Sequence, residues 1–238
     1  MSFIPNKDLF IVTSALKTGI GVIDEQTRLQ QTVEGLQSLR KYAPGAIILF
    51  VDASSRPVDE ATMMLLSKYC DRSISFYGDE DLMTLANAGL KSQAEVVLLF
   101  KTLNIIKQHP ELQKMMAGVR RVFKLSGRTN MLDGYDPKEY DDLYGKYVFK
   151  KRIPSWLPPQ KQAESGCDHL YITRMYSFCV SLFDNYLNSL PQIYQTINYH
   201  GVDTEHAHFG CIDKNYVVEF DNLYCEGVLA GNGQTERY

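Results

Sequence analysis

Four residues of types that suit phosphate binding stand close together near the middle of the chain: Lys124, Ser126, Gly127 and Arg128. The apolar residues within 119–125 predict a buried strand, so the four lie at or just after its carboxyl end. Open α/β sheets bind ligands at this end of their strands. A lysine supplies a point charge, an arginine supplies a planar fork of donors, and a glycine lets the backbone approach a ligand closely. The pattern predicts a phosphate-binding loop, with a basic surface loop as the alternative.

Polar residues also follow two earlier apolar runs. Thr13 and Ser14 come directly after residues 9–12, and Asp52 comes directly after residues 46–51. Small hydroxyl residues suit close approach of a ligand, and they equally suit a tight turn. An acid at a strand end is typical of the group that binds a ribose hydroxyl in nucleotide-binding folds. It is equally typical of a turn or a helix cap, so both interpretations stay open.

Two acidic clusters are candidates for a catalytic base or for metal ligands. Asp203, Glu205, His206 and His208 stand close together, and Glu205 and His208 share a helix face because they are three residues apart. A capped surface helix is the alternative for this cluster. The acidic residues 79–81 have the Asp-x-Asp spacing that can hold a divalent cation through hard oxygens, although acidic loops of this kind are common.

The elements that must position these residues alternate along the chain. Short apolar runs predict buried parallel strands, and apolar residues at spacings of three and four predict helices. This alternation predicts an α/β fold with a mostly parallel sheet in a single domain. The expected strands are 9–12, 46–51, 72–77, 119–125, 170–173 and 216–220, and the expected helices are 27–42, 61–69, 91–108 and, with a break near Pro191, 175–197.

Residues 133–165 differ from the rest of the chain because they mix proline, tyrosine and charged residues. We expect a long loop that closes over the site as a lid. The only tryptophan, Trp156, lies here and either stacks on a sugar or base or pins the loop to the core. Lys150, Lys151 and Arg152 either contact phosphate or form a solvated basic patch.

Composition bounds the class of protein. The chain has 238 residues, 45% hydrophobic and 22% charged, with a net charge of -3, which are globular values without a nucleic-acid signature. Its apolar runs are far shorter than the roughly 20 residues of a membrane span, and residues 1–7 lack the apolar core of a signal peptide. The five cysteines are widely spaced and predict neither a zinc site nor a disulfide framework. We expect a soluble cytoplasmic protein, or one of the host cytoplasm if the source is a virus.

These stretches, taken in order, resemble the small nucleotide-sugar glycosyltransferases of the GT-A fold found in bacteria and large DNA viruses. The resemblance implies one GT-A-like domain over residues 1–238 and a UDP- or GDP-sugar as donor. The stretches that carry it are residues 11–15; Arg28, Thr32, Leu36, Leu39 and Pro44; residues 51–52, 91–95, 124–128 and 173–177; Glu205 and His206; and residues 226–227 with Gly231 and Gly233.

The resemblance also implies roles for particular residues. Thr13, Ser14 and Asp52 face the base and ribose, and Ser126 and Gly127 belong to the donor-binding loop. Lys91 and Arg128 contact the diphosphate, and Lys124 and Arg128 neutralise it as it leaves. The acceptor hydroxyl needs a base if the reaction inverts, for which Glu205 is the first candidate and Asp203 the second.

One departure from the family concerns the metal. GT-A enzymes usually hold Mn²⁺ or Mg²⁺ through Asp-x-Asp after the fourth strand, where this chain has Ser126-Gly127-Arg128. In the small enzymes that the chain resembles, a Lys-x-Ser-Gly-Arg-Tyr stretch commonly lies there. This chain has Thr129 in place of the tyrosine of that stretch. Either cations neutralise the diphosphate without a metal, or ligands come from elsewhere, with Asp203, Glu205 and His206 as candidates.

Other functions remain open at this stage. The acceptor is a glycan, a protein side chain or a modified DNA base, and the last would need the basic residues 150–152. A sugar-phosphate nucleotidyltransferase would carry a Gly-rich basic loop after the first strand, of which residues 17–21 are a weak version. A non-catalytic nucleotide- or glycan-binding module is the third alternative.

Overall fold

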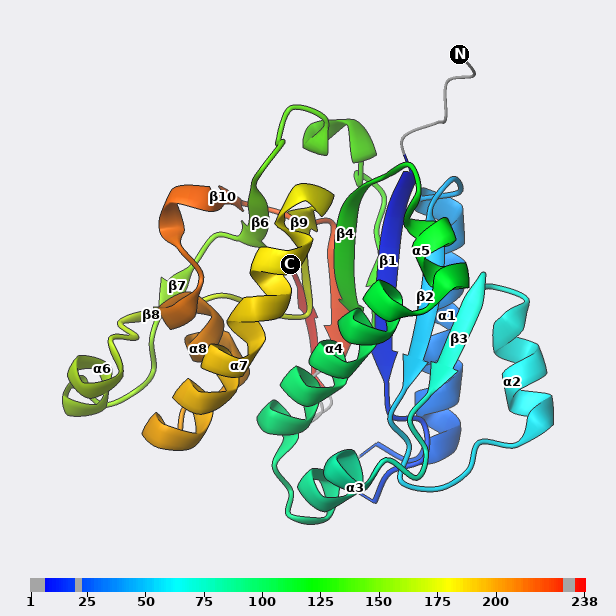
Figure 1. Ribbon diagram of the computed structural model, residues 1–238, viewed down its shortest axis with the longest axis horizontal. Coiled ribbons are helices and arrows are strands. Elements are labelled where there is room, and N and C mark those ends of the chain that lie inside the picture. The colour runs from blue at the N-terminus through cyan, green and yellow to red at the C-terminus, as the bar shows by residue number, and fades with distance from the viewer. Residues whose placement is uncertain (1–6, 20–22, 229–233) are drawn as a thin grey trace.

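A seven-stranded sheet organises the protein, with the strand order β10-β6-β9-β4-β1-β2-β3 (Figure 1). The structure is a computed structural model that describes residues 7–19, 23–228 and 234–238. β9 runs antiparallel to β4 and β6, and the other neighbouring pairs are parallel. The predicted α/β class with a mostly parallel sheet is confirmed. The strands are β1 Lys7–Ser14, β2 Ile47–Asp52, β3 Arg72–Ser75, β4 Val119–Ser126, β6 Tyr147–Lys150, β9 Met175–Cys179 and β10 Val217–Phe220.

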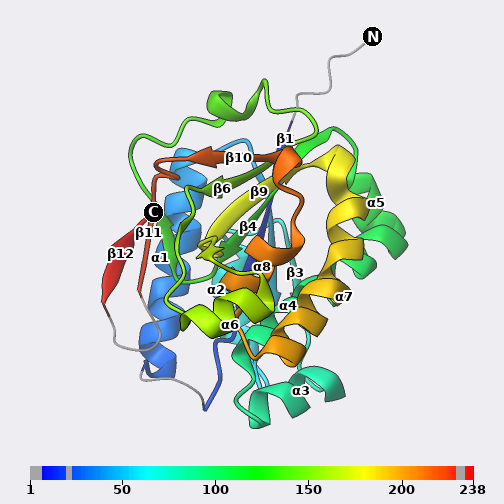
Figure 2. The same ribbon diagram turned by 90° about the vertical axis from the view of Figure 1, so that its left-hand side faces the viewer.

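Helices cover both faces of this sheet (Figures 1 and 2). α4, α7 and α8 pack on one another over one face, and α1 and α2 lie on the other. The helices are α1 Glu25–Tyr42, α2 Glu60–Ser67, α3 Glu80–Asn87, α4 Lys91–Gln108, α5 Pro110–Met116, α6 Pro159–Ser165, α7 Phe183–His200 and α8 Thr204–Cys211.

The core has two halves because side chains of a strand alternate between the two faces. In β1, Leu9 and Ile11 pack toward α4, α7 and α8, whereas Phe10 and Val12 pack toward α1. Phe10 also stacks on Phe123 of β4, with ring centroids 4.4 Å apart. Burial on both faces explains why these strands read as continuous apolar runs.

Smaller elements complete the fold. β5, β11 and β12 form a three-stranded antiparallel sheet beside α1, and the Ser38 hydroxyl of α1 accepts a hydrogen bond from Met131 N at 2.9 Å. A two-stranded pair, β7 with β8, lies beside α8 (Figure 1). The bounds are β5 Thr129–Met131, β7 Ile153–Pro154, β8 His169–Leu170, β11 Cys225–Val228 and β12 Thr235–Arg237, with 3₁₀ turns η1 Pro137–Tyr140, η2 Val180–Leu182 and η3 Lys214–Tyr216.

The helix expected over residues 175–197 is wrong in two respects. Residues 175–179 form β9, which is buried between β4 and β6, because a short apolar and aromatic run fits a buried strand as well as a helix. α7 then begins at Phe183 and runs through Pro191 without ending there. Packing of α7 against α4 and α8 stabilises it despite the backbone hydrogen bond that proline cannot donate.

The expectation of one long loop over residues 133–165 is also corrected. β6 lies in the middle of this segment and in the central sheet, and Tyr135, Tyr140 and Tyr147 are buried in the core. Aromatic rings decide this outcome, since burying them stabilises the fold more than leaving them on a mobile loop. Most of the segment is therefore a fixed part of the domain.

Shorter differences concern the ends of elements. The expected strand at 72–77 ends at Ser75, and the expected strand at 170–173 is reduced to the two residues of β8. All five cysteines are free thiols. Within the described ranges, no helix has both the length and the apolar character that crossing a membrane requires. Residues 20–21, 231 and 233, which entered the sequence interpretation, lie outside the described residues.

Candidate active site

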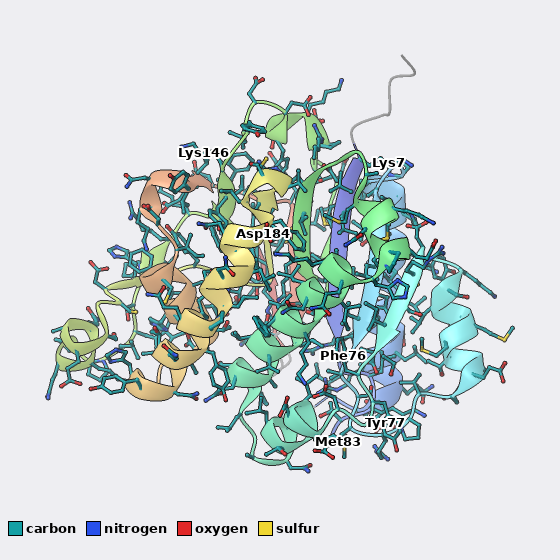
Figure 3. All side chains as sticks on the ribbon, in the orientation of Figure 1. Lys7, Phe76, Tyr77, Met83, Lys146 and Asp184 are labelled. Carbon is teal, nitrogen blue, oxygen red and sulfur yellow. The ribbon has the colours of Figure 1, made fainter. Side chains whose placement is uncertain are left out.

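A cavity of about 350 Å³ opens at the carboxyl edge of the parallel strands. In Figure 3, Phe76, Tyr77 and Met83 lie toward this edge, whereas Lys7 and Lys146, at the starts of β1 and β6, lie at the opposite one. The cavity is lined by Thr13, Ser14, Ala15, Thr18, Arg28, Ala53, Leu82, Ala86, Lys91, Ser92, Ala94, Glu95, Leu98, Ser126, Gly127, Arg128, Thr173, Arg174, Thr204 and Glu205. The predicted residues Thr13, Ser14, Lys91, Ser126, Gly127, Arg128 and Glu205 are thus brought together.

The floor of the cavity depends on a close approach of two strand ends at Gly127. Gly127 N donates a hydrogen bond to Thr13 O at 2.7 Å, and a Cβ at Gly127 would lie 3.0 Å from Ser14 Cβ and 3.1 Å from Thr13 O. The glycine is needed so that the ends of β1 and β4 can meet. Its N–H group is used in that contact, so the contribution of Gly127 to the site is steric.

α1 reaches the cavity through a similar contact at Gly35. A Cβ at this position would lie 2.8 Å from Thr129 O and 3.3 Å from Gly127 O. The helix therefore packs directly on the backbone that follows β4. This packing brings Arg28, two turns earlier in α1, into the cavity wall.

Three arginines from different elements converge on the cavity: Arg28 from α1, Arg128 from the loop after β4, and Arg174 from the segment before β9. Burial, together with repulsion by Arg28 and Arg174, lowers the pKa of Arg128 to about 10. Nη1 of Arg128 is buried, and among the described residues it has no hydrogen-bond partner. A buried cation that repels its neighbours and lacks an acceptor is a site for an anion.

The amino end of α4 adds to the positive potential. Lys91 and Ser92 in its first turn line the cavity, and Leu90 at the cap position makes no side-chain hydrogen bond to the helix. N–H groups in the first turn of a helix are without intrahelical acceptors, and the helix dipole favours an anion there. Lys91 supplies a full charge at the same place.

Glu205 faces the cavity from the first turn of α8. Asp203 caps this helix by accepting a hydrogen bond from His206 N at 3.0 Å, and this fixes the start of α8. Burial, together with the charges of Asp203 and Glu95, raises the pKa of Glu205 to about 7. A carboxyl group with a pKa near neutrality suits proton transfer.

A buried hydrogen-bond network anchors α8 to the core of the domain. His208 Nδ1 lies 2.8 Å from Thr204 O, which can only accept, so Nδ1 carries the proton. Nε2 then accepts from the hydroxyl of Tyr186 at 3.0 Å, and that hydroxyl also bonds Tyr176. Burial lowers the pKa of His208 to about 4, which keeps the ring neutral.

Lys124 lies beneath the cavity and is not part of its lining. Only 2% of its side chain is exposed, and Nζ forms an ion pair with Glu95 and donates to Ser126 Oγ at 3.0 Å and Thr173 O at 2.8 Å. Burial alone would raise the pKa of Glu95, but Lys124 outweighs it and holds that pKa below its usual value. Lys124 therefore holds lining residues in place and does not itself face the cavity.

Asp52 is also placed away from the cavity lining. It is fully buried, and its carboxylate accepts hydrogen bonds from Leu16 N and Ser54 N, both at 3.1 Å. Of the two interpretations that the sequence left open, this geometry corresponds to the turn. Asp52 ties the chain after β1 to the chain after β2.

The geometry does not suit His206 as a metal ligand. Nδ1 contacts Asp203 Oδ1 at 2.7 Å, and Nε2 contacts Ser155 Oγ at 2.9 Å. Both ring nitrogens are therefore engaged, and the ring is completely buried. Asp203 in turn is occupied as a helix cap.

The donor set as a whole does not fit Mn²⁺ or Mg²⁺. Residues 79–81 are drawn into ion pairs, since Lys101 Nζ lies 2.7 Å from oxygens of both Asp79 and Asp81. Over residues 7–19, 23–228 and 234–238, no group of three His, Cys, Asp or Glu side chains is placed to hold a metal ion. An arginine occupies the position after β4. We therefore derive no step that passes through a metal.

The sequence interpretation did not assign Arg28, Glu95 and Arg174 to the site, although all three belong to stretches that carry the resemblance. Recognising β9 as a strand would have placed Arg174 at the edge of the sheet, because Leu125 of β4 pairs with Met175. Glu95 of α4 pairs with Lys124 of the neighbouring strand β4.

Comparisons with known proteins bear on the fold. The sequence matches no protein-family profile, and no curated protein matches it. Core-mannan synthase A (CmsA/Ktr4) from Aspergillus fumigatus, in a Mn/GDP form, is similar in structure, with a TM-score of 0.54 and 10% identity over 93% of this chain and 74% of that one. The mannosyltransferase Ktr4p from S. cerevisiae has a TM-score of 0.53 and 10% identity over 92% of this chain and 70% of that one. The galactosyltransferase LgtC, in complex with donor and acceptor sugar analogues, has a TM-score of 0.54 and 11% identity over 89% of this chain and 72% of that one. The chain has the GT-A fold that these glycosyltransferases share, as the resemblance in sequence implied.

Proposed function

We propose that this protein is a glycosyltransferase that moves a sugar from a nucleotide-diphosphate sugar to an acceptor hydroxyl. The observation that carries the proposal is the convergence of Arg28, Arg128 and Arg174 on one cavity at the carboxyl edge of a GT-A sheet. Nη1 of Arg128 is buried and has no hydrogen-bond partner among the described residues, which favours an anionic acceptor there. Structural neighbours support a nucleotide donor, since CmsA was solved with GDP and LgtC with a donor analogue.

The donor spans the cavity from β1 to α8. Its base and ribose, of the UDP or GDP type, lie against Thr13 and Ser14, and its diphosphate lies between Arg128 and the amino end of α4 with Lys91. The sugar then points toward Glu205, which lines the cavity from the first turn of α8. This arrangement uses the strand-end position that open α/β sheets give to nucleotides.

The transfer reaction breaks the bond between the anomeric carbon and the diphosphate oxygen and forms a bond to the acceptor oxygen. Negative charge develops on the leaving diphosphate, where Arg128, Arg174 and Lys91 stabilise it. The acceptor hydroxyl loses its proton to Glu205, whose pKa near 7 suits a general base. The products are the glycosylated acceptor, a nucleoside diphosphate and a protonated Glu205.

Charge neutralisation in this enzyme is assigned to side chains. Four basic residues line the cavity, and of its two acids Glu95 is already paired with Lys124. The position where an Asp-x-Asp motif would bring a metal carries Arg128. We infer that the three arginines and Lys91 neutralise the diphosphate without a divalent cation.

Isothermal calorimetry with UDP, GDP, ADP and CDP, each with Mn²⁺ or with EDTA, tests both the binding of a nucleotide donor and its neutralisation by side chains. We expect one of the diphosphates to bind with nearly the same affinity in the two conditions. Binding that needs Mn²⁺ would refute charge neutralisation by side chains but leave the transferase standing. Absence of binding by all four nucleotides in both conditions would refute the proposed function itself.

The reaction products distinguish the glycosyltransferase from the nucleotidyltransferase and from the binding module. Incubation of the enzyme with the corresponding nucleotide-sugar should release nucleoside diphosphate slowly by hydrolysis, and faster with an acceptor. A nucleotidyltransferase would release pyrophosphate from a nucleoside triphosphate, and a binding module would release neither. The raised pKa of Glu205 inside the cavity favours the catalyst over the binding module.

A further inference from the structure

Trp156 is exposed to an extent that is unusual for a tryptophan. It is 61% exposed and lies between β7 and α6, on the side of the molecule where β7 and β8 adjoin α8 (Figure 1). Tryptophan is enriched at binding interfaces, and a ring that the structure already holds in place loses little entropy when a ligand covers it. Its neighbours in the chain show whether that condition is met.

Hydrogen bonds fix the backbone on both sides of Trp156. Ser155 N donates to Asp168 O at 2.9 Å, and Leu157 N donates to Ser155 Oγ at 3.1 Å. The side-chain amide of Gln162 donates to Leu157 O at 2.6 Å. An indole on such a fixed segment loses little conformational entropy when a ligand covers it.

The same contacts connect Trp156 to the start of α8. Ser155 Oγ bonds His206 Nε2 at 2.9 Å, and the indole lies edge-on to the His206 ring, with centroids 4.9 Å apart and an interplanar angle of 87°. Glu205 precedes His206 and lines the cavity. Consecutive helix residues point about 100° apart, so Trp156 occupies the flank of α8 next to the wall that carries Glu205.

The charges around Trp156 argue against a nucleic acid as its ligand. Lys151 pairs with Asp221 at 3.1 Å, and Arg152 pairs with Glu219 at 3.3 Å. Lys150 donates to a backbone carbonyl, Arg237 O, at 3.1 Å. The basic stretch that a DNA acceptor would need is therefore neutralised or engaged by the protein itself, and phosphate binding would have to break these contacts.

A flat apolar surface beside polar groups suits a pyranose ring. One face of a pyranose presents C–H groups, which pack on the negative face of an aromatic ring, while its hydroxyls remain free to bond polar neighbours. We propose that Trp156 is the stacking platform for a sugar unit of the acceptor, and that the acceptor is therefore a carbohydrate. This inference rests on the proposed function, because Glu205 must be the group that meets the acceptor hydroxyl.

Intrinsic fluorescence tests the inference directly, because Trp156 is the only tryptophan of the chain. The enzyme with bound nucleoside diphosphate is titrated with lactose, maltose, mannobiose and xylobiose, and separately with a single-stranded DNA and a threonine-containing peptide. We expect a saturable change in emission with at least one sugar. No change with any sugar, or a change with the DNA or the peptide alone, would overturn the proposal.

Variants provide an independent readout. Trp156→Ala should raise the KM for the sugar acceptor at least tenfold and leave the KM for the donor within twofold, and Trp156→Phe should recover part of the loss. The matched control is Tyr144→Ala, which removes an aromatic ring that is 80% exposed elsewhere on the surface. Equal acceptor KM values for Trp156→Ala and the control would overturn the role of Trp156 as a stacking platform. Donor binding, measured by calorimetry, tests the transferase function separately.

Discussion

Lys124 of β4, which lies beneath the cavity, forms an ion pair with Glu95 of α4, which lines it, and only Glu95 is partly exposed, at 29% of its side chain. The pair connects the central sheet to the helix whose amino end lines the site. Nζ of Lys124 has three acceptors, which also include Ser126 Oγ and Thr173 O. One lysine thus fixes residues of α4, β4 and the segment before β9 relative to one another.

Removing this lysine should destabilise the fold. Lys124→Met leaves Glu95 without its counter-charge, and we expect the free energy of unfolding to fall by about 2–4 kcal/mol, because a buried charge without a partner is costly. Urea denaturation measures the change. The double variant with Glu95→Gln should recover much of it, whereas Lys107→Ala, which breaks an exposed pair with Asp184, should cost less than about 1 kcal/mol. A similar loss in both lysine variants would contradict the assigned role.

Arg128 should carry donor affinity. Arg128→Ala is expected to weaken nucleoside diphosphate binding by about 1.5–3 kcal/mol, the scale of a hydrogen bond to a charged group. Arg128→Lys should recover only part of this, since an ammonium cannot form the planar fork. Calorimetry makes the comparison, with Arg72→Ala at the exposed edge strand β3 as control. Unchanged affinity in Arg128→Ala would remove the loop after β4 from the binding site.

Glu205 should control turnover and its pH dependence. The rate of transfer should rise with pH about a midpoint near 7, the pKa of the buried carboxyl, because only the ionised form accepts a proton. Glu205→Gln should lower kcat at least a hundredfold and change donor affinity little. Near-normal turnover in this variant, or a rate independent of pH between 6 and 8, would exclude Glu205 as the base.

The same carboxyl should also affect stability with a predictable sign. Its pKa is about 7 in the folded protein and 4.5 for a glutamate in the unfolded chain, so the folded state binds more protons between these pH values. The contribution of Glu205 to stability is therefore lost as pH rises from 4.5 to 7. Glu205→Gln should stabilise the protein at pH 8 by on the order of 2 kcal/mol and hardly at all at pH 4.5. Thermal or urea unfolding at the two pH values decides this.

Gly35 should be intolerant of any side chain. Alanine normally favours a helix by about 1 kcal/mol over glycine, but here its Cβ would lie 2.8 Å from Thr129 O. We expect Gly35→Ala to destabilise the protein by about 1–3 kcal/mol, because the helix must move off the loop after β4. Gly45→Ala is the control, as its Cβ would meet nothing within 4 Å. Stabilisation by Gly35→Ala would show that this close approach is not required.

Much of the fold follows from local pattern. α4 has the bounds that its spacing predicted, and β1, β2 and β4 lie where continuous apolar runs placed them. The positions of Thr13, Ser14, Ser126 and Arg128 at the cavity also follow, because parallel strands bring their carboxyl ends to one edge. β9 was missed, since five apolar and aromatic residues carry no period that separates a strand from a helix.

What the tertiary structure decided is which polar residues face the cavity and which lie beneath or beside it. Lys124 and Arg128 are four positions apart and both basic, yet Lys124 is neutralised by Glu95, whereas a buried nitrogen of Arg128 has no partner within the described part of the chain. Arg28 and Arg174 come from distant parts of the chain. Spacing along a chain determines the local backbone and the face on which a side chain lies. The charge, burial and partner of that side chain depend on atoms within a few ångströms, and folding brings most of those atoms from elsewhere in the sequence.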